Sequence, residues 1–315
     1  MDNWKPTADV AVLEQRARLL EKIRGFFAQR NVMEVATPLV SPAANPDPAT
    51  EPIRLATPER SFLRSSAEFA MKRLLAAGSG DIYELGPVFR AGESGRTHSP
   101  EFTMLEWYRR DWDYLQLMSE VSALVRFVGG GAFDSWPERT ITYAELFREY
   151  AGFDPHTVSD SELQSVGLAT NIEADQMTRN DWLDLVTTTV IQPALPEDTF
   201  TFVHQYPAGQ AALARVRPGS PPHAERFELY LGRMELANGY QELTDPDEQL
   251  RRFETENQRR RQASLIELPL DTLFLAALQH GLPECAGVAV GVDRLLMVLL
   301  EAGSIAEVLT FVAEY

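Results

Sequence analysis

The stretch from Phe89 to Phe102 constrains the fold of this chain more than any other segment. Apolar residues typical of strands flank it on both sides, and a polar turn that contains glycines lies between them. This pattern predicts a β-hairpin. Arg90 and His98 stand near the two ends of the turn, so such a hairpin would hold a guanidinium over a triphosphate. Taken alone, the pattern is equally compatible with an ordinary charged hairpin turn.

Three glutamates, Glu228, Glu235 and Glu242, recur every seven residues. The spacing suits one helix face, but Gly232 and the Asn238-Gly239 pair favour strands joined by turns. Strand alternation separates carboxylates that are seven residues apart, unless a turn or bulge restores a common direction. Facing one pocket, they would repel each other unless a cation such as Mg²⁺ neutralised them. The spacing is also compatible with unrelated surface glutamates.

A third segment near the C-terminus alternates small and apolar residues. Gly287, Ala289 and Gly291 would share one face of a strand and allow a flat ligand to approach closely. Arg294 would open a following helix over 295–300, near a positive helix N-terminus that favours phosphate. By itself this segment is weak evidence for a nucleotide site, because an aspartate such as Asp293 is a common helix N-cap before an arginine.

Together and in this order, these segments resemble the three motifs of class II aminoacyl-tRNA synthetases, and within them the lysyl-tRNA synthetase branch. The matching segments are Thr37-Pro38, Phe89-Arg90, 98–108, 235–239 and 291–294. The likeness runs from about Val10 to the C-terminus. Lysyl-tRNA synthetases carry an N-terminal anticodon-binding domain of the OB-fold type, whereas here the catalytic helix starts near Ala11. In this respect the chain is similar to the elongation factor P–(R)-β-lysine ligases.

The resemblance implies an activity and its substrates. That group activates β-lysine with ATP and transfers it to a lysine ε-amine of elongation factor P, without tRNA. ATP and Mg²⁺ would be required, and the amino acid would be β-lysine or lysine. The expected fold is α+β, a class II synthetase-like catalytic domain with a mainly antiparallel sheet flanked by helices. The protein would be a homodimer.

The resemblance also implies roles for individual residues. The catalytic residues would be Arg90 and Arg294. The ATP-binding residues would be Arg90, Gly92, Glu93, His98, Ser99, Phe102, Glu235, Leu236, Gly291 and Arg294. The amino acid would be bound by Ser66, Glu68, Tyr108, Asn238, Glu242 and Ala289. The metal would be held by Glu228 and Glu235.

Within this set, different residues would bind the adenine of ATP and the two amines of the amino acid. Phe102 and Arg294 would stack on opposite faces of the adenine. Glu242 and Tyr108 would bind the distal amine of the amino acid, while Ser66 and Glu68 would hold the amine nearer the carboxylate.

Three positions depart from the pattern of the synthetases. Gly92 stands where they have a glutamate that accepts from the adenine amino group, so Glu93 or a backbone carbonyl would take that role. Ser99 replaces an asparagine. Ala289 replaces a glycine and would narrow the amino-acid pocket by about one methyl group, which changes substrate choice by about 1–3 kcal/mol at most.

Charge and composition exclude several classes of protein. The formal net charge is −17, which disfavours broad binding to nucleic acid. A single cysteine, Cys285, rules out an internal disulfide and fits a reducing compartment. The N-terminus shows no secretion signal, and the apolar run from Gly287 to Leu300 is too short and too charged to span a bilayer. We therefore expect a cytoplasmic protein that binds no membrane.

The chain reads as one domain, 1–315, with a variable middle region over 134–222. Helices are expected over 11–30, 68–77 and 249–265, and strands from Phe227 to Leu243. The segment from Val32 to Val40 would be extended, and 41–58 a loop. The middle region mixes short helices with turns and shows no recognisable chemistry. The first helix and the Pro38 segment would form the dimer interface.

Two other functions stay open from the sequence: a synthetase that still charges tRNA, and a regulator without catalytic activity. The presence of Arg90, Glu235, Glu242 and Arg294 favours an enzyme, and the acidic charge opposes tRNA binding. An acidic enzyme that recognises an acidic acceptor protein would need a local basic patch. Candidates for that patch are Arg96, Arg109, Arg110 and the arginines near Arg259. The arginines of that helix would otherwise form a solvated face.

Overall fold

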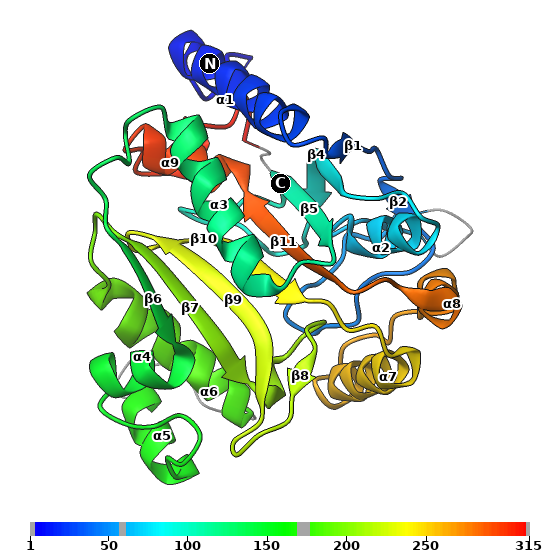
Figure 1. Ribbon diagram of the computed structural model, residues 1–315. Helices are drawn as coiled ribbons and strands as arrows, with labels where there is room; N and C mark the ends of the chain where they lie inside the picture. The colour runs from blue at the N-terminus through cyan, green and yellow to red at the C-terminus, as the bar shows by residue number, and fades with distance from the viewer. Residues whose placement is uncertain (1–3, 57–60, 169–176, 313–315) are drawn as a thin grey trace.

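The computed structural model describes residues 4–56, 61–168 and 177–312. Within these residues nine strands form one sheet in the order β1-β4-β5-β11-β10-β9-β7-β6, with β8 beside β9 (Figure 1). The strands of this sheet are β1 (Met33–Glu34), β4 (Ile82–Phe89), β5 (Glu101–Arg110), β6 (Glu138–Thr142), β7 (Phe200–Pro207), β8 (Val216–Arg217), β9 (His223–Leu231), β10 (Met234–Gln241) and β11 (Cys285–Gly291). A separate ribbon pairs β2 (Val40–Ser41) with β3 (Phe62–Leu63).

Most neighbours in the large sheet run antiparallel. Among the described strands, the parallel pairs are β1 with β4 and β6 with β7. The hairpin predicted around residues 89–102 is present as β4 and β5, which pair from Ile82↔Tyr108 to Phe89↔Glu101. The predicted α+β class with a mainly antiparallel sheet is therefore confirmed.

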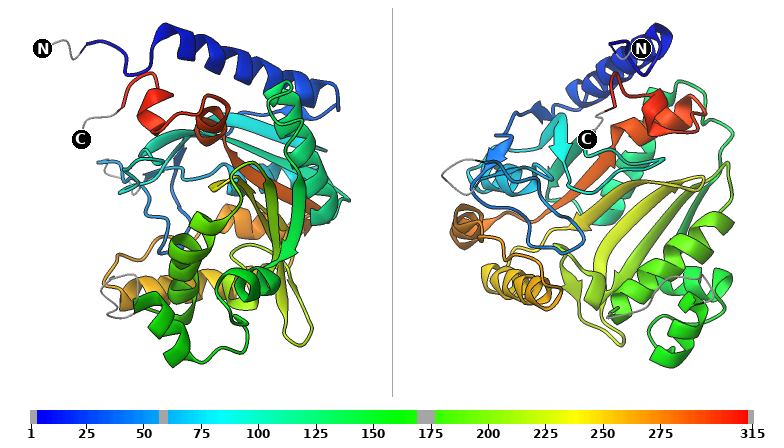
Figure 2. Two further views of the ribbon diagram at one scale, coloured as in Figure 1. Left: turned by 90° about the vertical axis from the view of Figure 1, so that its left-hand side faces the viewer. Right: turned by 180° about the vertical axis from the view of Figure 1, so that it is seen from behind.

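Helices surround the sheet. They are α1 (Val10–Ala28), α2 (Glu68–Ala76), α3 (Tyr114–Gly129), α4 (Tyr143–Tyr150), α5 (Asp160–Leu168), α6 (Arg179–Val186), α7 (Pro246–Gln262), α8 (Thr272–Gly281) and α9 (Val292–Leu299). Helix α3 covers one face of the central strands, whereas α4, α5 and α6 gather beside β6 and β7 (Figures 1 and 2). None of the helices in the described segments is long and apolar enough to cross a bilayer.

The alternation of side chains along the strands separates a core face from an open face. On β9, Phe227 and Leu229 enter the main hydrophobic core together with residues of α1 and α3. Their neighbours Arg226, Glu228 and Tyr230 point to the opposite face. There the segment after β2 crosses the sheet (Figure 2, right). The polar side chains that line this open face, such as Arg226 and Glu228, therefore point away from α3.

The middle region contributes more than the sequence predicted. Residues 134–222 were expected to form short helices and turns, but β6 and β7 from this region extend the main sheet. Strand β7 begins with a continuous buried run, Phe200 to Val203, rather than an alternating one. Threonine and phenylalanine alternate over 199–202, but so short a stretch does not distinguish a strand from a helix segment by periodicity alone.

Two helices begin earlier than predicted. Helix α7 starts at Pro246 rather than Gln249, because the Asp245 side chain accepts from the backbone N–H groups of Asp247 and Glu248. It ends at Gln262. Helix α9 starts at Val292 rather than Leu295, so Arg294 lies in its first turn.

The predicted solvated arginine face of α7 is wrong at Arg260, which is fully buried. Its guanidinium lies 2.5 Å from the Glu51 carboxylate and donates to the Ile266 carbonyl. Arg109 is likewise buried, against Glu120 and Asp81. Neither arginine is free to form the basic patch that the sequence analysis considered.

Asp293 links three elements rather than capping α9, whose N-cap is Gly291. Its side chain is buried and accepts from the backbone N–H of Thr103 at 2.6 Å and from the guanidinium of Arg16. Helix α1, strand β5 and helix α9 therefore meet at one carboxylate.

We expect Asp293→Ala to lower the free energy of unfolding by about 3–5 kcal/mol, because it leaves the Arg16 guanidinium without its partner in a largely buried position. Denaturant unfolding followed by circular dichroism measures this loss. Asp293→Asn retains one acceptor oxygen and should lose less. An unchanged unfolding midpoint for Asp293→Ala would contradict this role.

Candidate active site

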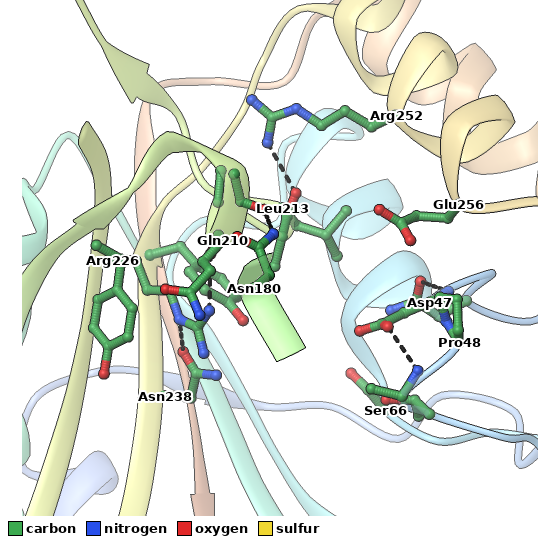
Figure 3. A pocket seen from close by; sticks show the side chains of 18 of the residues that line it. Asp47, Pro48, Ser66, Asn180, Gln210, Leu213, Arg226, Asn238, Arg252 and Glu256 are labelled. Carbon is green, nitrogen blue, oxygen red and sulfur yellow. Dashed lines mark hydrogen bonds between the residues drawn. The ribbon is translucent and has the colours of Figure 1, made fainter. Parts of the chain in front are cut away.

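A cavity of about 1380 Å³ opens on the polar face of the sheet (Figure 3). Its floor comes from β5, β9, β10 and β11, and its walls come from α7, from the loop at Asp47 and from the middle region. A smaller cavity of about 130 Å³ adjoins it beside the β4–β5 hairpin. The two share the lining residues Arg90, Met104, Glu235, Asn238 and Ala289. They therefore form two ends of one continuous site.

The structure brings nearly all predicted site residues together. Those assigned to ATP line the smaller cavity: Arg90, Glu93, His98, Ser99, Phe102, Glu235, Leu236, Gly291 and Arg294. Those assigned to the amino acid and metal line the larger one: Ser66, Glu68, Tyr108, Glu228, Asn238, Glu242 and Ala289. Gly92 lines neither cavity and takes a positive φ of 78° in the turn.

Arg294 lines the smaller cavity and is held in place by two neighbours. Its guanidinium donates to the backbone carbonyl of Glu235 at 2.9 Å and lies 2.6 Å from Nε2 of His98. Burial and the neighbouring Arg294 charge lower the pKa of His98, so the imidazole is neutral at pH 7 and Nε2 accepts. The backbone carbonyl and the imidazole thus fix the orientation of the arginine.

Arg90 stands at the junction of the two cavities. Its guanidinium carbon lies 5.1 Å from the centre of the Phe102 ring, and Nη1 donates to Glu93 at 3.3 Å. Its buried Nε has no hydrogen-bond partner among the described residues. Arg90 therefore keeps donor capacity for an anionic ligand.

A β-bulge places the predicted carboxylates on one face. Strict alternation would put Glu235 and Glu242 on opposite faces, but the pairing of β10 with β9 shifts between Glu235 and Ala237. After the shift, Asn238 pairs with Glu228, and both side chains line the cavity. The prediction that a turn or bulge restores a common direction is confirmed.

Glu228 and Glu235 differ in their partners. Glu228 accepts from Arg226 at 2.6 Å and from the Tyr230 hydroxyl at 2.7 Å. Desolvation and the nearby Glu228 charge raise the pKa of Glu235. Its side chain still exposes 40% of its surface to the cavity, and water there moderates this rise. A bound cation would relieve the repulsion that remains between the carboxylates of Glu228 and Glu235.

Within the described residues, no group of three or more His, Cys, Asp or Glu side chains could hold a metal ion. A preformed cage is therefore absent from this part of the chain. The two carboxylates do fit a hard cation that takes its other ligands from water and substrate phosphates, as Mg²⁺ commonly does.

Lys72 was not predicted from the sequence as a site residue; it is fully buried under the amino-acid end of the cavity. Its ammonium lies 2.5 Å from the carboxylates of both Glu68 and Glu242. Burial would lower the pKa of Lys72, but the two carboxylates outweigh it and raise that pKa. The spacing of Glu68 and Lys72 on a predicted helix was the available signal, since residues four apart share a face.

Glu106 is a second missed residue of this end. Its buried carboxylate accepts from the Ser66 hydroxyl at 2.9 Å and from the backbone N–H of Ala67 at 2.8 Å. Burial raises its pKa to about 7. It stands two residues before Tyr108 on β5, so strand alternation could have placed it in the pocket. It holds the turn that presents Ser66 and Glu68.

The sequence predicted that Gly287 would let a flat ligand approach the strand. In the structure, the space beside Gly287 is filled by two side chains. A Cβ atom there would lie 2.3 Å from the Tyr108 ring and 2.4 Å from Oε1 of Glu242. Any larger residue would displace both side chains. The absence of a side chain at Gly287 therefore sets the depth of the amino-acid end.

Residues 5–314 match the family model for tRNA synthetases class II (D, K and N). The chain belongs to this family. An elongation factor P–(R)-β-lysine ligase of Vibrio cholerae serotype O1 is 44% identical, over 98% of this chain and 97% of the relative. Proteins of the same name from Yersinia pestis and Yersinia pseudotuberculosis are 41% identical over the same shares.

These comparisons confirm the resemblance that the motifs predicted. The chain groups with the elongation factor P–(R)-β-lysine ligases inside the class II synthetase family, and members of this kind are ligases. A ligase of the class II synthetase type implies the use of ATP.

We expect Lys72→Met to lower the free energy of unfolding by about 3–5 kcal/mol at pH 8, because Glu68 and Glu242 lose their shared cation. The loss should be smaller at pH 6. Burial raises the pKa of Glu242 to about 7, far above its value in the unfolded chain, so lower pH protonates it and favours the folded state.

Urea unfolding at the two pH values measures this difference. Arg73→Met changes the charge of the next residue on α2, which is exposed, and serves as the matched control. Equal losses for Lys72→Met at pH 6 and pH 8 would show that the carboxylates do not depend on Lys72.

Proposed function

We propose that this protein is an ATP-dependent ligase that activates (R)-β-lysine or lysine and transfers it to a lysine ε-amine of elongation factor P. The names of its relatives support this acceptor and this amino acid. The observation that carries the proposal is a single continuous site, with arginines at one end and carboxylates at the other.

The charge of the amino-acid end fits a substrate with two amines. Three carboxylates surround it, those of Glu68, Glu106 and Glu242, and Lys72 compensates one of them. When all are ionised, the net charge of these four groups is two negative units. Burial raises the pKa of Glu106 and of Glu242 to about 7, so a bound cation would favour this ionised state. An amino acid with two ammonium groups would match that charge, whereas one with a single amine would leave one carboxylate uncompensated in a largely buried position.

The first step joins the amino acid to the nucleotide. A carboxylate oxygen of the amino acid attacks the α-phosphorus of ATP, the bond to the β-phosphate oxygen breaks, and pyrophosphate leaves. The chain supplies no nucleophile to this step. We propose that Arg90 and Arg294, which line the smaller cavity, bind the phosphates and stabilise the charge that develops, while Phe102 stacks on the adenine.

We propose Glu228 and Glu235 as the residues that would hold Mg²⁺ beside the phosphates. When bound, the ion neutralises phosphate charge and assists the departure of pyrophosphate. The donor types fit this ion, and Glu235 keeps 40% of its side-chain surface open in the same cavity that Glu228 lines.

Substrate choice would depend on the floor of the pocket. Ala289 lines both cavities, so its methyl group lies where the two ends of the site meet. We propose that it restricts the space beside the carboxylate of the amino acid, where a β-amino acid and an α-amino acid differ. One methyl group changes such a preference by about 1–3 kcal/mol.

The proposal places the reaction in the cytoplasm, where elongation factors act, and includes no tRNA. A net charge of −17 and the buried state of Cys285 are compatible with this setting.

The proposal is tested by incubating the protein with ATP, Mg²⁺, either lysine isomer and purified elongation factor P. We expect the acceptor to gain the mass of one aminoacyl group, measured by mass spectrometry. Charging of lysine tRNA with no gain on the acceptor would instead identify a synthetase. No product and no pyrophosphate exchange with either isomer would reject the ligase.

Arg90→Ala serves as the variant control in the same assay. We expect pyrophosphate exchange to fall about a hundredfold or more, because a donor to the developing charge is removed. Circular dichroism should show an unchanged fold. Exchange near the wild-type rate would remove Arg90 from its proposed role.

We further propose that two copies associate through the edge formed by α1, β1 and β2. Exposed apolar side chains at Met33, Leu39 and Val40 support this interface. Light scattering should give twice the mass of one chain, and Val40→Asp should reduce it to the mass of a monomer. Leu115→Asp, at an exposed position on α3, is the control and should leave the dimer intact.

A further inference from the structure

One wall of the large cavity takes no part in the steps described above. It is formed by the middle region, with Asn180 and Asp184 from α6 and Gln210 from the turn after β7. Asp47 and Ser66 lie across the cavity from Asn180 and Gln210 (Figure 3). This wall is continuous with the amino-acid end and remains accessible for a second substrate.

Asp184 presents a carboxylate to this part of the cavity. It is exposed to the water there, and Nε2 of Gln210 donates to its Oδ1 at 2.7 Å. Across the described residues, no lysine or arginine comes within ion-pair distance of it. Limited solvation raises the pKa of Asp184 to about 6, and the nearby carboxylates act in the same direction, although the charge of Arg226 opposes the rise. A cationic ligand would compensate this carboxylate.

Gln210 adds a second acceptor. The side chain is 7% exposed, and its Oε1 has no hydrogen-bond partner in the described part of the chain. A buried carbonyl oxygen without a donor is unusual in a folded protein. Nε2 of the same amide donates to Asp184, so the atom of Gln210 that is left without a partner is its acceptor oxygen, Oε1.

The cations nearest to this wall are already engaged. Arg226, whose charge acts on Asp184, donates to Glu228, to Asn238 and to the backbone carbonyl of Gln210. The whole cavity is lined by ten acidic side chains and five arginines among the described residues. This lining attracts a cationic group with several donors and disfavours an anion.

We propose that Asp184 and Gln210 form the acceptor site, which binds the side-chain ammonium of the lysine that receives the aminoacyl group. An alkylammonium carries three donors, and the wall offers the two carboxylate oxygens of Asp184 and the free Oε1 of Gln210. A lysine on an extended loop of the acceptor protein would reach the site through the cavity mouth. The inference rests on the proposed function and assigns its second substrate to the middle region.

The transfer that follows balances without another reagent. The acceptor ammonium releases a proton to water, and its nitrogen forms a bond to the carbonyl carbon of the adenylate. The bond between that carbon and the phosphate oxygen breaks, and AMP leaves with the electron pair. The nitrogen then releases a second proton, which gives the neutral amide. Asp184 and Gln210 act before this step, by holding the acceptor amine near the adenylate.

The test separates the two half-reactions in the full-length protein. In Asp184→Asn, we expect amino-acid-dependent pyrophosphate exchange to stay within about twofold of wild type. The rate of transfer to elongation factor P at low acceptor concentration should fall about tenfold or more, because the charge partner of the ammonium is lost. Formation of the hydroxamate from hydroxylamine, which is largely neutral at pH 7.5, should be unaffected.

Two further variants complete the design. Asp184→Glu retains the charge and should recover part of the transfer rate, which a purely structural role would not require. Glu162→Gln makes the same charge change on α5, at an exposed position away from the cavity, and should behave as wild type.

The outcomes are distinct. Transfer by Asp184→Asn at the wild-type rate overturns the acceptor site, as does an equal loss of pyrophosphate exchange, which would assign Asp184 to the first step. A wild-type protein that neither exchanges pyrophosphate nor modifies the acceptor overturns the proposed function, and the acceptor site with it.

Discussion

Along the central strands, successive side chains point to opposite faces of the sheet, and this period of two residues determines where the polar groups of the protein lie. On β5, Leu105 and Trp107 enter the core, while Glu106 and Tyr108 line the cavity. The core holds the sheet rigid beneath α3, so the opposite face can carry many charged groups. The bulge between Glu235 and Ala237 shifts this period, so that Glu235 and Asn238 both lie on the open face.

On the open face, cationic side chains neutralise some of the carboxylates and leave others without a partner charge. Lys72 balances one carboxylate of the amino-acid end, and Arg226 occupies Glu228. What remains is negative where amines are proposed to bind, whereas Arg90 and Arg294 offer guanidinium donors where phosphates are proposed to bind. Fixed charges of this kind need no reorganisation when a substrate arrives, which is the main way such sites assist phosphoryl chemistry.

Much of this site was predictable because its residues lie in short motifs with strong local patterns. The hairpin that carries Arg90 and the glycine-rich strand before Arg294 were both recognisable from the order of residue types. Lys72 and Asp184 were not, because their importance comes from long-range contacts. Lys72 meets Glu242 across 170 positions, and Asp184 faces the cavity only because β6 and β7 join the sheet. Single-sequence patterns do not report such neighbours.

The carboxylate of Asp293 couples the position of Arg294 to that of the first long helix. Arg294 follows it directly in the chain, and Asp293 is tied to Arg16 on the first long helix and to the backbone of β5. The proposed nucleotide contact is therefore aligned by a helix that lines neither of the two cavities. Strain applied to that helix, for instance when a second copy of the protein docks beside it, would be transmitted to the guanidinium through one short side chain. Assembly and nucleotide affinity would then be thermodynamically linked.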